Sequence, residues 1–422
     1  MFVNRREWLC GALTAAMLPA GASAQAESTS LAFDVPVPID HDRPSAGTMA
    51  LRCEWGAEPR PDRRTVIAVA DAQQYYVRPG GAARLQRDLF GESANLLAIV
   101  GRSRSDSLAR LVMPEGRTDW NVAYRLLNWR QWAGDLSSVI RHLTIPSERL
   151  GLYGRSGGAH LIHQLLTLRP DLGGRAYVQA AVNHPLDVRW GLGADRSWRD
   201  LAAADPGLAR QALEWLALHP DQRRNLILVI QRQNFFEPLE TILSARMAAV
   251  RAFLRGDQAE IEAMRDRYQI AALEQMRASL EGVGAAVRVY EFASPHADPR
   301  ALRSDLQPDV EALFYYASPL ADEGYRPAVA PAEWARLREV RGEVLQVAGR
   351  HDHTCDYRTQ IGLNGLTRGS TLLILDDNHV FRRWTDSGTQ PGLVQAFFAG
   401  GTASAGFRSA LDAMRSLRWR ES

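Results

Sequence analysis

The sequence lacks several features that would assign a protein to a class at once. Its 422 residues include 3 cysteines, too few for a scaffold built on disulfides. The formal net charge is +2, which gives no indication of nucleic acid or an acidic membrane surface as a partner. No run approaches the roughly 18 apolar residues of a membrane span, and no repeat of solenoid period is present. What remains is a chain of ordinary composition, 46% hydrophobic and 23% charged, long enough for one large domain with an insertion or for two domains.

Residues 1–24 have the pattern of an export signal. The segment Asn4–Leu9, with Arg5 and Arg6, resembles a twin-arginine signal; a weakly apolar stretch and the small residues Ala22-Ser23-Ala24 follow it. The alternative is an amphipathic N-terminal helix that stays attached. We expect a mature protein that begins near Gln25, is periplasmic or secreted, and has the twin-arginine export machinery as the partner of its precursor.

Two cysteines would remain after the signal is removed, because Cys10 lies within it. Cys53 and Cys355 can pair in a compartment that permits disulfides. Two buried free thiols are the equal alternative, and the sequence leaves both open.

The most informative stretch is Leu150-Gly151-Leu152-Tyr153-Gly154-Arg155-Ser156-Gly157-Gly158. A short apolar run ends in Gly-x-Ser-x-Gly and passes directly into a helical segment. This is the pattern of a nucleophile elbow, a sharp strand-to-helix turn that raises the serine hydroxyl above a sheet. The glycines two before and two after Ser156 suit the close approach of strand and helix. The backbone N–H of Gly157 would then face a developing oxyanion.

Strands and helices are expected to alternate through the first half of the chain. Thr65–Ala70, Asn95–Val100 and Ala176–Asn183 read as strands, and apolar residues at three- and four-residue spacings predict one long helix over Val122–Leu143. This alternation predicts an α/β fold with a doubly wound, mostly parallel sheet.

From about Arg189 the pattern becomes mostly helical. Helices are expected over Ser197–Leu218, Glu240–Arg255 and Ala259–Glu281; Asn225–Ile230 fits either a strand or a buried helix, and Val287–Phe292 alternates like a strand. The α/β rhythm then resumes with two further strands. We therefore predict an inserted helical cap, with the chain divided into a core of 31–188 and 326–402, a cap of 189–325, and a C-terminal tail of 403–422.

Partners for the serine follow the two later strands. The strand ending at Ala348 leads to Asp352, and the strand ending at Leu375 leads to His379. The order serine, acid, histidine is the order of the elbow architecture, and the carboxyl ends of parallel strands are where such sheets place their sites. A serine hydroxyl needs a positioned base, and the base needs an orienting carboxylate.

On these residues the chain resembles the α/β-hydrolases with a helical cap, most closely the prolyl-aminopeptidase and secreted tripeptidyl-aminopeptidase branch. The matching segments are Val37–Asp40, Gly101–Asp106, Gly154–Gly158, Gly349–Asp352 and His379. The resemblance covers most of residues 33–190 and 340–400. It implies the α/β-hydrolase fold, with Ser156 as nucleophile, His379 as general base and acid, and Asp352 as orienting carboxylate.

The chain departs from that branch after its first parallel strand. A His-Gly-Gly-Pro-type oxyanion loop stands there in the branch, whereas this chain has Asp71-Ala72-Gln73-Gln74. We expect a backbone N–H near Ala72 to complete the oxyanion hole with Gly157, since the donor is the main chain.

Other residues have competing interpretations. His351, Asp352, His353, Cys355 and Asp356 look like metal ligands, but consecutive loop residues seldom converge on one ion, so no metal is expected. Glu237 and Glu240 are candidates to hold a substrate amine, as cap carboxylates do in aminopeptidases of this type. The alternative is a helix N-terminus that favours acidic residues. Arg102 and Arg104 are expected to be solvated turn residues.

The sequence therefore predicts an exported serine hydrolase without a cofactor. Its first substrate class is the amide or peptide bond of a small molecule or short peptide, cleaved aminopeptidase-like through an acyl-enzyme. A carboxylesterase is the first alternative, and a catalytically weakened hydrolase-fold binding protein is the second. Neither nucleic acid nor a membrane span is expected.

Overall fold

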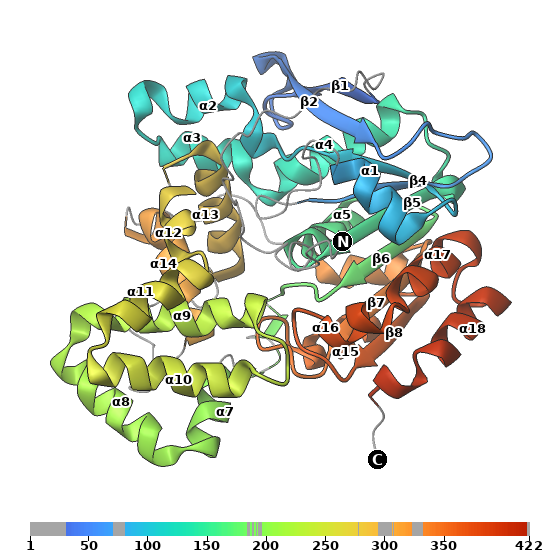
Figure 1. The fold of residues 1–422 in the computed structure, drawn as a ribbon. Coiled ribbons are helices and arrows are strands. Elements are labelled where there is room, and N and C mark those ends of the chain that lie inside the picture. The colour runs from blue at the N-terminus through green and yellow to red at the C-terminus, as the bar shows by residue number, and fades with distance from the viewer. Residues whose placement is uncertain are drawn as a thin grey trace, which may run out of the picture.

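A single mixed sheet organises the chain (Figure 1). The computed structural model describes residues 31–70, 81–183, 196–276, 278–293, 308–322 and 332–419, with the short pieces 186–187, 190, 192 and 306. Across the described sheet the strand order is β1-β2-β4-β3-β5-β6-β7-β8. The strands are β1 (Ala32–Pro38), β2 (Thr48–Trp55), β3 (Thr65–Ala68), β4 (Asn95–Ile99), β5 (Leu150–Arg155), β6 (Arg175–Gln179), β7 (Glu343–Gly349) and β8 (Ser370–Leu375).

The pairing confirms the predicted doubly wound, mostly parallel sheet. Strands β1 and β2 pair antiparallel, as do β2 and β4, and every later pairing is parallel. The carboxyl ends of β3 to β8 therefore lie along one edge of the sheet. Segments that follow these strands, although far apart in sequence, meet at this edge.

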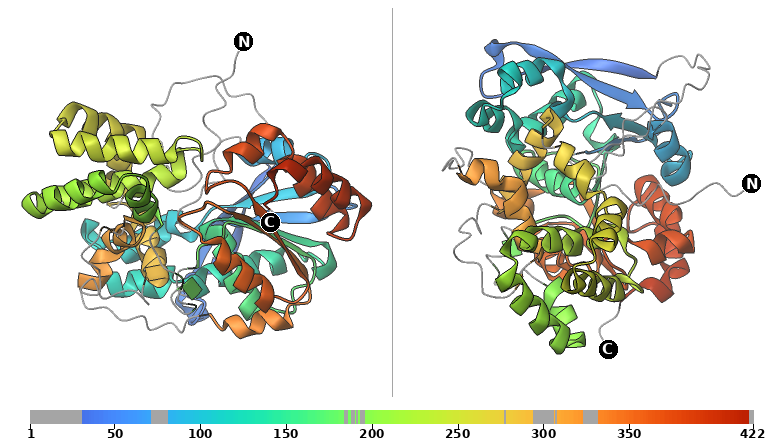
Figure 2. Two further views of the ribbon diagram at one scale, coloured as in Figure 1. Left: turned by 90° about the horizontal axis from the view of Figure 1, so that it is seen from below. Right: turned by 60° about the vertical axis from the view of Figure 1, so that its left-hand side comes forward.

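Successive strand residues pack on opposite faces, as the period of two requires. In β3, Ile67 belongs to one apolar cluster and Val66 to the other; in β5, Leu152 and Tyr153 divide in the same way. Helices α4 and α5 cover the first face. Helix α17 and the neighbouring segments cover the second (Figure 2). Because both faces are covered, the central strands are almost continuously apolar.

The helices fall into three groups along the chain. Those before β6 are α1 (Gly81–Leu85), α2 (Asp106–Val112), α3 (Trp120–Leu127), α4 (Trp129–His142) and α5 (Gly157–Leu168). Between β6 and β7 lie α7 (Ser197–Ala204), α8 (Pro206–Leu218), α9 (Arg223–Phe236), α10 (Ile242–Arg255), α11 (Gln258–Arg267), α12 (Ile270–Met276), α13 (Leu280–Ala293) and α14 (Pro308–Asp322). The last are α15 (Tyr357–Leu366), α16 (Arg382–Ser387), α17 (Gln390–Gly400) and α18 (Ala405–Ala413).

The second group forms the inserted helical cap. In both figures these helices project beyond the sheet on the side of its carboxyl ends, and α7 to α10 form the outermost layer. No helix in the described part of the chain is long and apolar enough to cross a membrane.

The expected helix over Val122–Leu143 is two helices, α3 and α4, broken at Asn128. The Asn128 side chain accepts hydrogen bonds from the N–H groups of Arg130 and Gln131 and donates to the carbonyls of Tyr124 and Arg125. Asn128 thus caps both helices at once. The apolar stripe continues through the break, which is why spacing alone predicted one helix.

The strand expected over Val287–Phe292 is wrong, because this segment lies inside α13. The polar residues of the alternation are buried: Arg288 pairs with Glu291 one helical turn later and donates to Gln164 of α5. Burial on all sides hides a helical period. The ambiguous Asn225–Ile230 is helical, within α9.

The chain end packs on the rest of the fold. Helix α18 places Phe407 in the same apolar cluster as Phe397 of α17. Beyond it, Leu417 accepts a backbone hydrogen bond from Asp376, and Trp419 donates one to Ile374 at the sheet edge.

Candidate active site

Ser156 occupies a strained turn between β5 and α5. Its backbone angles are φ +49° and ψ −120°, a region that serine rarely adopts. A Cβ on Gly154 would lie 2.7 Å from the carbonyl carbon of Gly158, so strand and helix approach this closely only because residue 154 is glycine. Strain of this kind persists where the surroundings enforce it, typically at functional sites.

The surroundings of Ser156 hold the turn in place. Its N–H donates to the carbonyl of Gln179 in β6 over 2.8 Å, and its carbonyl accepts from the N–H of His160 over 3.1 Å. Gly157 is the first residue of α5, where N–H groups have no partner within the helix. A helix N-terminus favours negative charge, so an oxyanion beside Ser156 is electrostatically suited to this position. Ala72, the other expected oxyanion donor, lies outside the described residues.

Asp352 and His379 form a buried pair at the same edge of the sheet. His379 Nδ1 lies 2.8 Å from Asp352 Oδ2. The other carboxylate oxygen, Oδ1, accepts the N–H groups of Thr354 and Cys355, each over 2.8 Å. Asp352 is 0% exposed, and both its oxygens are hydrogen-bonded, which is the condition for a buried carboxylate. The arrangement keeps the Nδ1 proton toward Asp352 and leaves Nε2 as the basic nitrogen.

The loop that carries His379 is fixed on both sides. The ring of Phe235 in α9 packs edge-on against the imidazole, with centroids 5.1 Å apart. Asn378 donates through Nδ2 to the carbonyl of Glu237 over 2.8 Å, which joins this loop to the cap. Asp377 accepts the N–H groups of Asn378 and Trp384, although burial raises the pKa of Asp377 to about 6.

The serine and the histidine follow different strands of the same sheet edge. Ser156 follows β5 and His379 follows β8, with β6 and β7 between them. Neither the Ser156 hydroxyl nor His379 Nε2 has a hydrogen-bond partner among the described residues. Catalytic hydrogen bonds are often long before substrate binds.

Glu237 and Glu240 both have partners within the chain. Glu237 is buried; its carboxylate accepts from Thr241 and Tyr268 and pairs with Arg267. Burial raises the pKa of Tyr268 to about 12, and the adjacent Glu237 charge adds to the effect. Glu240 is half-exposed and pairs with Arg383. Their role as holders of a substrate amine stays a prediction.

The candidate metal ligands after β7 point to separate partners. His351 pairs with Asp376 near the surface, His353 contacts the cap, and Asp356 caps α15. Asp352, Cys355 and His379 do have ligand atoms within 4.8 Å of one another. Burial and the nearby carboxylates raise the pKa of Cys355 well above its ordinary range, so this thiol stays protonated. Cys53 and Cys355 are both free and buried, which corresponds to the second of the two alternatives.

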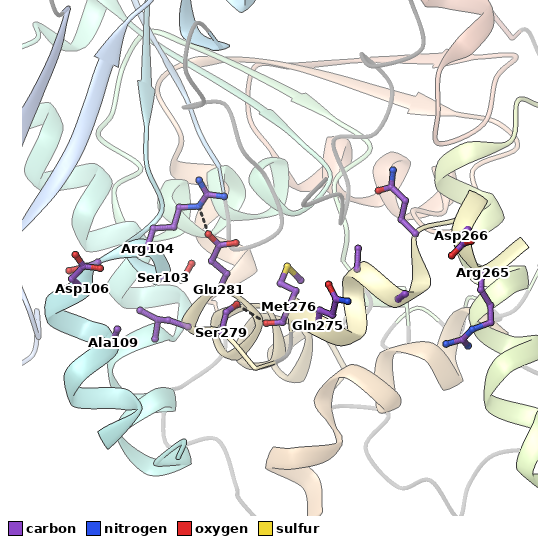
Figure 3. A pocket seen from close by; sticks show the side chains of 15 residues that line it. Ser103, Arg104, Asp106, Ala109, Arg265, Asp266, Gln275, Met276, Ser279 and Glu281 are labelled. Atoms are coloured by element: carbon purple, nitrogen blue, oxygen red, sulfur yellow. Dashed lines mark hydrogen bonds and ion pairs between the residues drawn. The ribbon is translucent and has the colours of Figure 1, made fainter. Parts of the chain in front are cut away.

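A cavity of about 730 Å³ lies between core and cap (Figure 3). Its core wall comes from the turn after β4 and the start of α2, with Ser103, Arg104 and Asp106. Its cap wall comes from α11, α12 and α13, and an ion pair of 2.8 Å between Arg104 and Glu281 joins the two walls. The cavity size is that of ordinary small-molecule sites.

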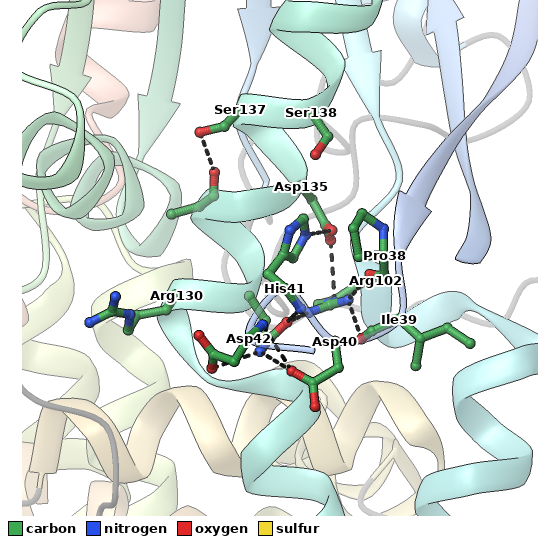
Figure 4. A network of polar contacts seen from close by, with 12 residues as sticks. Pro38, Ile39, Asp40, His41, Asp42, Arg102, Arg130, Asp135, Ser137 and Ser138 are labelled. Atoms are coloured by element: carbon green, nitrogen blue, oxygen red, sulfur yellow. Dashed lines mark hydrogen bonds and ion pairs between the residues drawn. The ribbon is translucent and has the colours of Figure 1, made fainter. Parts of the chain in front are cut away.

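Arg102 was expected in solvent, and this is wrong. Its side chain is 0% exposed and donates to Gln131 Oε1 and to the carbonyls of Pro38 and Ile39 (Figure 4). An arginine in a turn motif gives no sign of burial, because its partners come from segments distant in sequence.

Sequence reasoning missed the residues that support the His379–Asp352 pair. The cap brings Phe235 to the pair and Arg246 to His353, the residue after Asp352, and only the folded chain shows this. Asn378 is the supporting residue that the sequence could have indicated, because it directly precedes His379.

No protein-family model matches the chain, and no curated protein matches it. Among solved structures, it is similar to proline iminopeptidase of Mycobacterium smegmatis, with 12% identity, a TM-score of 0.44, and 86% of this chain and 97% of that chain covered. It is similar to bromoperoxidase of Bacillus anthracis, with 12% identity, a TM-score of 0.44, and coverages of 86% and 98%. For an esterase of Exiguobacterium antarcticum the identity is 11%, the TM-score 0.41, and the coverages 84% and 96%.

The molecule's own topology identifies its architecture. The sheet begins with an antiparallel pair and continues as parallel strands, and a cap is inserted between β6 and β7. Ser156 lies at the turn after β5, Asp352 follows β7 and His379 follows β8. A serine on a strained strand-to-helix turn, followed in the chain by acid and histidine, belongs to one fold. The chain has the α/β-hydrolase fold.

Proposed function

We propose that the protein is an exported serine hydrolase that works by acyl transfer. Ser156 is the nucleophile, His379 the general base and acid, and Asp352 the carboxylate that orients the imidazole. The observation that carries the proposal is the buried 2.8 Å pair of His379 and Asp352 at the sheet edge that also bears Ser156 in its strained turn.

The chemistry proceeds in two halves. Ser156 Oγ attacks the substrate carbonyl while its proton passes to His379 Nε2, and the backbone N–H of Gly157 binds the oxyanion. The tetrahedral intermediate collapses as His379 protonates the leaving amine or alcohol. Water then attacks the acyl-enzyme, with His379 taking its proton, and the acid product leaves Ser156 free. Asp352 stays ionised throughout and stabilises the imidazolium.

The substrate class that we propose is the amide or peptide bond of a short substrate. The resemblance of the sequence to the aminopeptidase branch supports this class. The cavity between core and cap has none of Ser156, Asp352 and His379 in its lining, so it does not bear on the choice. An ester substrate uses the same three residues, so the bond type is a matter for experiment.

Labelling by a fluorophosphonate probe tests the catalytic assignment. Wild type is expected to label at Ser156, and Ser156→Ala and His379→Ala are expected to lose labelling while they stay folded by circular dichroism. Folded wild type that fails to label would contradict the proposal and favour a binding protein of hydrolase fold.

Glu237 offers a test of the aminopeptidase-like class. Its carbonyl is held by Asn378 beside His379, and Arg267, the partner of its carboxylate, is largely exposed and can be displaced by a substrate ammonium. Glu237→Gln is expected to raise KM for aminoacyl-naphthylamides and to leave KM for p-nitrophenyl esters unchanged. Glu240→Gln gives the matched measurement for the second carboxylate. Turnover of esters alone by wild type would favour the carboxylesterase.

Export is tested by the N-terminus. Changing Arg5 and Arg6 to lysine is expected to retain the precursor in the cytoplasm, and N-terminal sequencing of exported wild type is expected to begin near Gln25. An unprocessed wild-type protein would favour the attached helix instead.

A further inference from the structure

His353 stands between the acid of the site and the cap. It directly follows Asp352, and its side chain is almost fully buried. Both of its ring nitrogens contact side chains of cap helices rather than residues of the core. Arg246 of α10 lies 2.9 Å from Nδ1, and Asp200 of α7 lies 2.8 Å from Nε2.

These two contacts define the state of the ring. A guanidinium can only donate, so Nδ1 must accept from Arg246 and carry no proton. The proton is therefore on Nε2 and is donated to the Asp200 carboxylate. Burial lowers the pKa of His353, and the charge of Arg246 lowers it further. A neutral ring with this single tautomer fits both partners.

On the cap side of this contact, Arg246 is held by a network of hydrogen bonds. Arg246 is 0% exposed and donates to Asn234 Oδ1 in α9. Asn234 donates to Asp309 of α14 over 2.6 Å, and Ser197 of α7 donates to the other oxygen of Asp309 over 2.8 Å. Residues of α9, α14 and α7 thus support Arg246 of α10 where it meets His353.

The core side of the contact is the turn that orients Asp352. The chain turns after Asp352, and the N–H groups of Thr354 and Cys355 both donate to Asp352 Oδ1. His353 is the residue enclosed by this turn. Fixing its side chain from outside fixes the turn, and the turn sets the direction of the carboxylate toward His379.

We propose that His353 is a positioning residue through which the cap holds Asp352 in line with His379. The inference rests on the proposed function, since it concerns the same three reacting residues. Its consequence is that the alignment of the acid depends on the contacts of His353 with the cap. The charged groups that face His353 are Arg246 from α10 and Asp200 from α7, with Asp309 from α14 behind them.

Variants of His353 itself give the first test. His353→Phe keeps the ring volume and removes both contacts, and kcat/KM is expected to fall about 10-fold to 100-fold. The fall is expected in kcat with KM little changed, because a misaligned Asp352 impairs proton transfer at His379 rather than substrate binding. His353→Asn retains an acceptor for Arg246 and His353→Gln a donor for Asp200, so each is expected to restore part of the rate.

A change on the cap alone gives the second test and tolerates a failure of His353→Phe to fold. Asp200 is half-exposed, and Asp200→Ala removes one partner of His353 without touching the acid loop. A fall in kcat with KM little changed is expected here as well. Glu214→Ala in the neighbouring helix α8 is the control, since it removes an exposed cap carboxylate that pairs with Arg210 and does not contact His353.

The His379 Nδ1 proton gives a readout that mere stability does not move. Its low-field proton resonance is expected in wild type and Glu214→Ala, and broadened or shifted in Asp200→Ala and His353→Phe. An unchanged kcat and an unchanged resonance in folded His353→Phe and Asp200→Ala would overturn the inference. Wild type that does not label with fluorophosphonate would instead overturn the proposed function, so the two failures are distinct.

Discussion

Both oxygens of the buried Asp352 carboxylate have defined partners. It accepts two backbone N–H groups through Oδ1 and faces His379 through Oδ2. We expect Asp352→Asn to lower kcat by about 10³-fold to 10⁴-fold, because an amide N–H facing Nδ1 favours the wrong imidazole tautomer. Steady-state kinetics on a chromogenic substrate measures this. Unchanged kcat in a folded variant would remove Asp352 from the mechanism.

His163 is buried, but its ring nitrogens gain no hydrogen bond from the described residues, and it has no role in the proposed chemistry. It lies fully buried in α5, and neither Nδ1 nor Nε2 has a hydrogen-bond partner in the described part of the chain. Burial lowers the pKa of His163 to about 4 from 6.5. The folded-state pKa is below that of the unfolded chain, so the unfolded chain takes up the proton first. The contribution of the neutral ring to stability is therefore present above about pH 6.5 and is lost as pH falls toward 4.

We expect His163→Leu to raise the free energy of unfolding at pH 7 by about 1–3 kcal/mol, since two unpartnered polar atoms leave the interior. Between pH 6.5 and 4, wild type is expected to lose on the order of 3 kcal/mol that the variant keeps. Urea unfolding at several pH values measures both effects. His142→Leu, at an exposed site in α4, is the control and should change neither.

At the scale of elements, the break at Asn128 determines where α4 starts and hence which of its residues face the sheet. Asn128→Ala removes the acceptor for the first turn of α4 and the donors to the last turn of α3. The expected loss in free energy of unfolding is about 1–2 kcal/mol. Asn128→Asp keeps the acceptor and loses the donors, so it should fall between the two in thermal unfolding. A loss below about 0.5 kcal/mol in Asn128→Ala would mean that packing alone defines the break.

The elements also show where periodicity is informative. The strands β3 and β5 and the elbow were predicted close to their observed bounds, because buried parallel strands are short apolar runs bounded by turn residues. In α13 the same reasoning failed, because its charged residues are buried as an ion pair. The spacing of apolar residues indicates which face of a helix is buried. Helix α13 is surrounded by other elements, so its spacing does not distinguish one face.

At the scale of the molecule, Arg102 joins three distant segments: the end of β1, the turn after β4, and α4 (Figure 4). Its Nε lies 3.2 Å from Asp135 Oδ2, and Asp135 Oδ1 in turn lies 2.8 Å from His41 Nε2. Burial lowers the pKa of Arg102, while Asp135 and Asp40 oppose that effect. The guanidinium thus compensates a carboxylate in the interior.

We expect Arg102→Met to lower the free energy of unfolding by about 3–5 kcal/mol, because it leaves Asp135 buried without its cationic partner. Arg52→Met, on the β1–β2 hairpin that Arg102 contacts, breaks an exposed pair with Asp34 and should cost less than about 1 kcal/mol. Denaturant unfolding compares the two. Equal losses would show that the buried network contributes no more than a surface pair.

The sequence by itself determined the α/β class, the elbow at Ser156, and the order of Asp352 and His379, because each depends on local chemistry: glycine at a tight turn, apolar runs as strands, polar residues at strand ends. Only the tertiary structure decided which side chains surround the site. Three examples join segments far apart in the chain: the buried Arg102, the contact of Phe235 with His379, and the contacts of His353 with Arg246 and Asp200. Such contacts depend on how distant segments, including the cap and the sheet, pack against each other. No local sequence pattern encodes that packing.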